Sequence, residues 1–133
     1  MVDTGYWYAV CDRRDAHHRD AVRRFSAFES YGVAFPWPCL YKTLNTSFVE
    51  NRHAMARFAA ITRLPRVERL DDAPYRDEAY GETMSTALTR PISLVDTVMR
   101  LMLDDVDVRV NGLLTFNRKD FYDVCRTRGV EML

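Results

Sequence analysis

The stretch LLTFNRKDF, residues 113–121, carries an apolar run directly into a polar cluster. Residues 113–116 suit a buried strand, whereas residues 117–120 are Asn-Arg-Lys-Asp. In parallel α/β sheets, ligands lie beyond the carboxyl ends of the strands. The stretch therefore predicts one of two things: an ordinary solvated turn, or the rim of a functional site.

Composition favours a single folded domain. The chain has 133 residues, of which 47% are hydrophobic, so one domain spanning residues 1–133 can build a core. The 19 basic and 19 acidic residues cancel. Net charge therefore gives no support to nucleic-acid binding, although a local basic patch could still provide it.

The cysteines and the hydropathy pattern point to an intracellular protein. Cys11, Cys39 and Cys125 are odd in number and show no zinc-ligand spacing, so we expect free, mostly buried thiols in a reducing cytoplasm. We recognise no secretory signal, and no apolar run is long enough to span a membrane. The sequence thus predicts a cytoplasmic protein without membrane contact.

Strand and helix patterns alternate along the chain. We expect strands at residues 1–2, 33–36, 66–70, 112–116 and 130–133. We expect helices at residues 6–11, 15–32, 36–49, 51–64, 74–88, 91–105 and 119–129, with a weak point at Gly81. Alternation of this kind predicts an α/β fold with a central parallel sheet and helices on both faces.

Asp96 is the most informative carboxylate. The polar stripe of its helix contains Thr97 and Arg100, whereas Asp96 aligns with the apolar residues Met99 and Leu103. A carboxylate on an apolar row must be paired, hydrogen-bonded or bound to a metal, because burying a bare charge is costly. The alternative is an aspartate on the shoulder of the helix, or one bonded to a neighbouring helix N-terminus.

Two further acids follow predicted strands. Asp3 could cap the next helix, and Asp120 could be an ordinary first-turn acid. Together with Asp96 they could instead converge on one crevice, where oxygen ligands select Mg²⁺ or Mn²⁺. Such an ion activates a bound water and offsets charge on a phosphodiester.

Three segments in this order resemble the PIN-domain ribonucleases, close to VapC-type toxins of type II toxin–antitoxin systems. VDTGYWYAV (2–10) resembles the opening motif with its first acid, and SLVDTVMRLML (93–103) resembles the helix of the third acid. LLTFNRKDF resembles the closing motif. The resemblance implies a three-layer α/β/α sandwich and a Mg²⁺- or Mn²⁺-dependent RNA endonuclease. It implies that the metal ligands are Asp3, Asp96 and Asp120, with Thr115 and Asn117 positioning ligands or water.

The chain departs from the family pattern at Lys42. In WPCLYKTLN (37–45) the resemblance leads us to expect a second acid, a glutamate, where Lys42 stands. Glu50 would lie about 12 Å further along the helix axis, so it is a poor substitute. If Lys42 lies among the carboxylates it stays charged, repels a cation, and bridges Asp3 and Asp96 in its place. The alternative is a surface lysine outside the site.

Two functions remain open from the sequence. One is a ribonuclease toxin that Lys42 impairs, and the other is a PIN-like module that binds an antitoxin or RNA without cutting it. RNA contacts are expected from Arg13, Arg14, Arg118 and Lys119, although the first two also suit a solvated helix face. The resemblance also implies a cognate antitoxin and a homodimer. An unrelated receiver-like or nucleotide-binding α/β domain is a more distant alternative.

Aromatic and histidine residues of the N-terminal half have simpler interpretations. Tyr6, Trp7 and Tyr8 are expected in the core, whereas an exposed Trp37 or Tyr41 could contact an antitoxin. His17 and its neighbour His18 point in different directions on a helix and make a poor metal pair.

Overall fold

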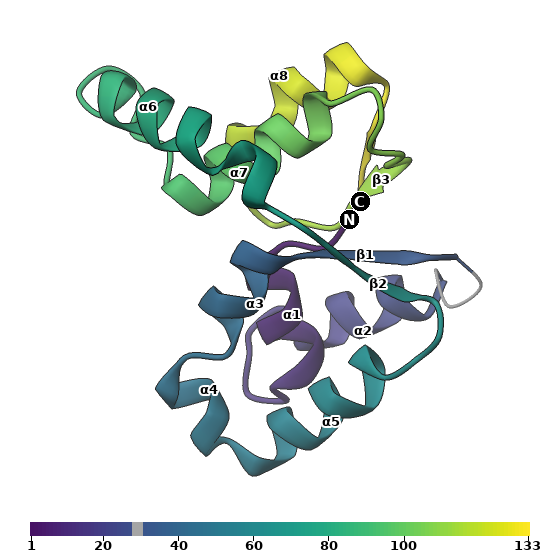
Figure 1. Ribbon diagram of the computed structural model, residues 1–133. Helices are drawn as coiled ribbons and strands as arrows, with labels where there is room; N and C mark the ends of the chain where they lie inside the picture. Colours follow the sequence, from purple (N-terminus) through teal and green to yellow (C-terminus); the bar gives the residue numbers. More distant parts are fainter. Residues whose placement is uncertain (28–30) are drawn as a thin grey trace.

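The computed structural model describes residues 1–27 and 31–133, and its fold is a mixed α/β arrangement rich in helices (Figure 1). The helical elements are α1 (Thr4–Cys11), α2 (His18–Ala27), α3 (Trp37–Thr43), α4 (Thr46–Glu50), α5 (Arg52–Thr62), the short 3₁₀ helix η1 (Ala73–Tyr75), α6 (Arg76–Thr86), α7 (Leu94–Asp104) and α8 (Arg118–Arg128). The strands are β1 (Val33–Pro36), β2 (Val67–Leu70), β3 (Gly112–Leu113) and β4 (Glu131–Met132).

All strand pairing among the described residues is parallel, as the sequence predicts. β1 pairs with β2, and β3 pairs with β4, so the strands form two small sheets. Residues 1–3 connect them: the Val2 amide donates to the Ala34 carbonyl (3.1 Å), and the Leu114 amide donates to the Met1 carbonyl (2.9 Å). The expected short first strand is a single bridge between Val2 and Leu114.

The helices lie on two sides of these strands. In Figure 1, α1 to α5 lie below β1, whereas α6, α7 and α8 lie above it. The mixed α/β class and the parallel pairing are confirmed. The strands are short, so the finer description as a three-layer sandwich around one central sheet stays a prediction.

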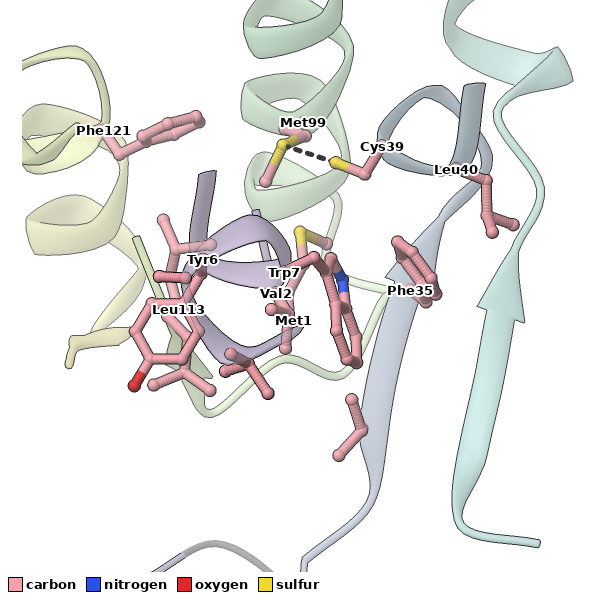
Figure 2. Packing of buried hydrophobic residues seen from close by; sticks show 14 of the residues in the cluster. Met1, Val2, Tyr6, Trp7, Phe35, Cys39, Leu40, Met99, Leu113 and Phe121 are labelled. Atoms are coloured by element: carbon pink, nitrogen blue, oxygen red, sulfur yellow. Dashed lines mark hydrogen bonds between the residues drawn. The ribbon is translucent and has the colours of Figure 1, made fainter. Parts of the chain in front are cut away.

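Aromatic packing dominates the core beneath β1. The Trp7 ring is fully buried, and its centroid lies 4.6 Å from that of Phe35 and 5.6 Å from those of Phe25 and Phe58. This confirms the expected core position of Trp7. On the other side of the strands, Phe121 of α8 is also fully buried (Figure 2).

α7 packs against α3 through two sulfur atoms. Cys39 Sγ lies 3.2 Å from Met99 Sδ, and both side chains are buried (Figure 2). Cys11 and Cys125 are buried too, and none of the three cysteines forms a disulfide, as their odd number predicts. Within the described parts of the chain, no helix combines the length and the apolar character needed to cross a membrane.

The single helix predicted over residues 36–49 is wrong, because the structure divides it into α3 and α4. The Asn45 side chain accepts a hydrogen bond from the Phe48 amide (3.2 Å) and so caps a new helix. Tyr41 and Leu44 are exposed, whereas Leu40 and Phe48 are buried, so these four residues do not share one buried face. Local capping by an asparagine therefore outweighs the helical spacing of the apolar residues.

Replacing Asn45 with alanine is expected to lower the free energy of unfolding by about 1 kcal/mol, the usual loss for an N-cap. The Asn45 amide also donates to the Lys42 carbonyl (3.1 Å), so the variant loses a second contact. Urea denaturation followed by circular dichroism measures the change. An Asn45→Asp variant keeps the capping oxygen and should lose less stability, and an equal loss in both variants would contradict the capping role.

Other boundaries differ in smaller ways. The first helix begins at Thr4 rather than at residue 6, and α6 continues through Gly81 without a break. Gly129 adopts the left-handed conformation (φ 67°) that ends α8, as predicted. The second predicted helix, over residues 15–32, includes Phe28, and residues 28–30 lie outside the described residues.

Candidate functional site

Asp3 lies where the first extended segment ends and α1 begins. It occupies the N-cap position, but its side chain does not cap the helix. Its carboxylate instead accepts a hydrogen bond from Thr115 Oγ1 (2.8 Å), which links the N-terminal segment to the segment between β3 and α8. Only 7% of Asp3 is exposed. The simple capping role is therefore wrong for this side chain, which is available for another function.

Asp96 lies in the first turn of α7 and is 8% exposed. The neighbouring residues on its row, Met99 and Leu103, are buried, as the helical spacing predicts. Within the described chain, the Asp96 carboxylate has no hydrogen bond or ion pair, and only its backbone amide is bound, by Ser93 Oγ (3.2 Å). A nearly buried carboxylate without a partner is a group that a cation would stabilise.

The two carboxylates influence each other, and we call them the acid pair. Burial raises the pKa of Asp3, the hydrogen bond from Thr115 opposes this, and the negative charge of Asp96 raises the pKa further. Burial, followed by the charge of Asp3, also raises the pKa of the Cys39 thiol to about 12, and Asp96 contributes as well. Cys39 is therefore an uncharged thiol beside the acid pair.

The variant Asp3→Asn is expected to be more stable than the parent chain at neutral pH in the absence of metal. The folded state raises the pKa of Asp3, so ionisation costs stability as pH rises through and beyond the ordinary value of 3.8. The advantage of the variant should therefore be complete above the raised pKa and vanish in acid. Urea denaturation at several pH values tests this, and a variant less stable than the parent at pH 7 would contradict it.

Lys42 is close enough to the acid pair to act on it electrostatically, but it does not bridge it. Its positive charge is the weakest of the influences resolved on the pKa of Asp3, and it lowers that pKa. The side chain is exposed at the end of α3, and among the described residues it forms no ion pair with Asp3 or Asp96. The predicted bridge is therefore wrong, because the ammonium remains in water rather than entering the buried pair.

Two residues that the sequence analysis did not assign to the site hold the backbone of Lys42. The Tyr8 hydroxyl donates to the carbonyls of Lys42 (3.1 Å) and Thr43 (3.3 Å), and Asn45 donates to the Lys42 carbonyl. No sequence signal marks Tyr8 for this role, because its partner lies 34 residues away.

Asn117 and Asp120 form a second polar group at the start of α8. The Asn117 side-chain amide donates to Asp120 Oδ2 (2.7 Å), and the Asn117 backbone amide donates to Thr115 Oγ1 (3.0 Å). A chain of hydrogen bonds therefore runs from Asp3 through Thr115 and Asn117 to Asp120. The predicted rim residues thus lie together, although their contacts do not establish a ligand.

Arg100 supports this second group and was not recognised as part of it. Its guanidinium donates to the Asp120 carbonyl and makes two hydrogen bonds to the Asp123 carboxylate (2.6 and 2.8 Å). These bonds hold the pKa of Asp123 well below its usual range. The sequence places Arg100 on a polar stripe, but it cannot show that its partners lie on another helix.

The predicted RNA contacts lie in two exposed places. Arg13 and Arg14 belong to the loop before α2 rather than to a helix face, and Arg14 pairs with Asp12 (2.9 Å). Arg118 and Lys119 are exposed in the first turn of α8, where Arg118 donates to the Met132 carbonyl (3.3 Å).

The donor set does not make a complete site for a hard cation. Asp3 and Asp96 supply the carboxylate oxygens that Mg²⁺ prefers. However, residues 1–27 and 31–133 contain no group of three or more acidic, histidine or cysteine side chains that could hold a metal. Asp120 is engaged by Asn117, and Lys42 brings a positive charge near the pair.

Comparisons with known protein families, curated proteins and solved structures find no match.

Proposed function

We propose that this chain is a PIN-like domain of the ribonuclease-toxin type, impaired in RNA cleavage by Lys42. The observation that supports this most is the acid pair: two nearly buried carboxylates that repel each other, neither of which forms an ion pair within residues 1–27 and 31–133. Asp3 lies at the end of the first extended segment and is hydrogen-bonded to Thr115, which follows the bridge residue Leu114, and α/β folds bind ligands at such strand ends. An arrangement with this much uncompensated negative charge is suited to a divalent cation.

The three-layer α/β/α sandwich is part of this proposal. Residues 1–3 form backbone hydrogen bonds to both β1 and Leu114 beside β3, so the two small sheets can be described as one five-segment layer. Helices lie on both sides of that layer in Figure 1. The order β2, β1, residues 1–3, β3, β4 puts the first acid at the centre of the layer.

A second candidate is a PIN-like module that binds without cutting, and Lys42 favours it. The resemblance expects a glutamate at this position, and an exposed ammonium there opposes cation binding electrostatically. In this case the acid pair would be a remnant of an ancestral catalytic site, and the chain would act through its partners alone.

We propose a cognate antitoxin as the protein partner. A groove of about 600 Å³ opens beside Lys42 between α3, α6 and α7. Its lining residues are Pro38, Tyr41, Lys42, Asp72, Arg76, Asp77, Tyr80, Leu94, Val95 and Val98. Trp37 and Tyr41 are both exposed, with ring centroids 5.7 Å apart, so apolar side chains of an antitoxin have a surface to cover. The proposed homodimer rests on the resemblance alone, whereas the proposed cytoplasmic location rests on the free cysteines.

A cleavage assay of the parent chain and its Lys42→Glu variant tests the proposal, with Mg²⁺ or Mn²⁺ and with EDTA. Cleavage by the variant alone supports an impaired ribonuclease. Failure of both chains on every RNA tried contradicts it and favours the binding module.

A further inference from the structure

Three aromatic rings lie side by side from the core to the surface next to the acid pair. The Phe116 ring stacks on that of Tyr6, with centroids 5.1 Å apart and 18° between the planes. It also stacks on the His17 ring, with centroids 4.5 Å apart and 26° between the planes. Tyr6 is fully buried, Phe116 is 38% exposed, and His17 is exposed. The rings therefore form a stack anchored in the core by Tyr6, with Phe116 in the middle and His17 as the outermost ring.

The chain holds this stack in place from both ends. The Tyr6 hydroxyl donates to the Ala21 carbonyl (3.1 Å), which fixes the inner ring. The His17 backbone amide donates to Asp15 Oδ1 (2.8 Å), and Nδ1 of the adjacent His18 ring donates a hydrogen bond to the Ala9 carbonyl (2.7 Å). The outer ring therefore belongs to a loop that is ordered by local hydrogen bonds, so little ordering is needed when a ligand binds.

The stack adjoins the acid pair through the backbone. Phe116 lies between Thr115, whose hydroxyl binds Asp3, and Asn117, whose side chain binds Asp120. Exposed cationic side chains lie near these two rings along the chain, Arg13 before His17 and Lys119 after Phe116. An exposed aromatic ring beside cationic groups is the combination that single-stranded nucleic acids need, since bases stack and phosphates are neutralised.

We propose that the outer face of the His17 ring, which is backed by Phe116, forms a stacking platform for one unpaired base of an RNA strand whose backbone passes the acid pair. This inference rests on the proposed function, because it names the substrate class for that site as single-stranded RNA. A duplex would not bind in this way, because its bases are stacked on one another and present no free face. Because every base presents a flat aromatic face, the platform binds an unpaired nucleotide whichever base it carries.

The test measures binding rather than cleavage, so it does not depend on Lys42. A fluorescein-labelled single-stranded RNA dodecamer of mixed sequence is titrated with the parent chain in EDTA, and anisotropy is recorded. His17→Ala should weaken binding about fivefold to tenfold, the usual effect of losing one base–aromatic contact. His17→Phe keeps an aromatic face and should retain binding, which separates stacking from the charge of a histidine.

Two controls separate stacking from fold and charge. His53→Ala removes an exposed histidine from α5 and should bind like the parent. An abasic ribose-phosphate dodecamer offers phosphates without bases, and it should bind weakly and equally to the parent and to His17→Ala.

The outcomes distinguish this inference from the proposed function. If the parent binds RNA and His17→Ala binds it equally well, the platform is wrong while an RNA-binding role survives. Equal binding of RNA and of the abasic strand by the parent also overturns the platform alone. If the parent binds no RNA at all, both the platform and the proposed function are contradicted.

Discussion

The Lys42→Glu variant is expected to cleave single-stranded RNA with Mg²⁺ or Mn²⁺ at least roughly a hundredfold faster than the parent chain. A metal ion stabilises developing charge by several kcal/mol, and each 1.36 kcal/mol corresponds to about tenfold in rate. The substitution removes a positive charge that acts on Asp3 and adds a carboxylate at the same place. Initial rates on a fluorogenic RNA, compared for the two chains at equal concentration, measure the gain.

Lys42→Gln is the matched control for this experiment. It removes the positive charge but adds no carboxylate, so it separates loss of repulsion from gain of a ligand. We expect a much smaller gain than for glutamate. Asp96→Asn introduced into the Lys42→Glu chain should abolish the restored cleavage, because it removes one member of the acid pair. Equal metal-dependent cleavage by the parent and the glutamate variant would mean that Lys42 lies outside the site.

Metal binding by the Lys42→Glu variant can also be measured without RNA, through the thermal stability of the protein. A ligand that binds only the folded state raises stability in proportion to the logarithm of its concentration over Kd. Millimolar Mn²⁺ should therefore raise the melting temperature of Lys42→Glu and leave that of the parent nearly unchanged. An equal shift in both chains would indicate metal binding elsewhere on the surface.

The sequence predicted individual members of the site better than their contacts. Asp96 could be recognised because a carboxylate on an apolar helical row is physically unusual, and its carboxylate is indeed buried without a partner in the part of the chain that the structure describes. The hydrogen bond between Thr115 and Asp3 could not be predicted from spacing, since the two residues lie 112 positions apart. The same holds for Arg100, whose partners are on α8.

The incorrect predictions about Lys42 and about the helix over residues 36–49 have physical causes that are difficult to infer from the sequence. Lys42 was expected to bridge the acids because charge attraction favours it, yet its ammonium remains in water, where it keeps its hydration. The break between α3 and α4 was missed because apolar spacing continued across Asn45, while the capping bond to Phe48 decided the structure. The parallel pairing of the strands was predicted correctly, because a short apolar run between two helical segments leaves few alternatives to a buried parallel strand.

Replacing Trp7 with alanine is expected to lower the free energy of unfolding by about 3–5 kcal/mol, the usual range for a buried tryptophan. The ring is fully buried against Phe25 of α2, Phe35 of β1 and Phe58 of α5, so its removal leaves a cavity bounded by three elements. Urea denaturation followed by circular dichroism at 222 nm measures the loss, since this far-ultraviolet signal does not depend on tryptophan fluorescence.

Two tryptophan variants show whether burial is the cause. Trp37→Ala removes the other tryptophan, which is 37% exposed, and should cost less than about 1 kcal/mol. Trp7→Phe keeps an aromatic ring and removes the Trp7 indole N–H, which is buried without a hydrogen-bond partner. Its cost should be well below that of alanine, because losing an unsatisfied donor offsets part of the lost volume. Similar losses for Trp7→Ala and Trp37→Ala would contradict a core held together by the Trp7 ring. Because Trp7 lies one turn beyond Asp3 on α1, the same packing fixes the helix that positions the first acid of the pair.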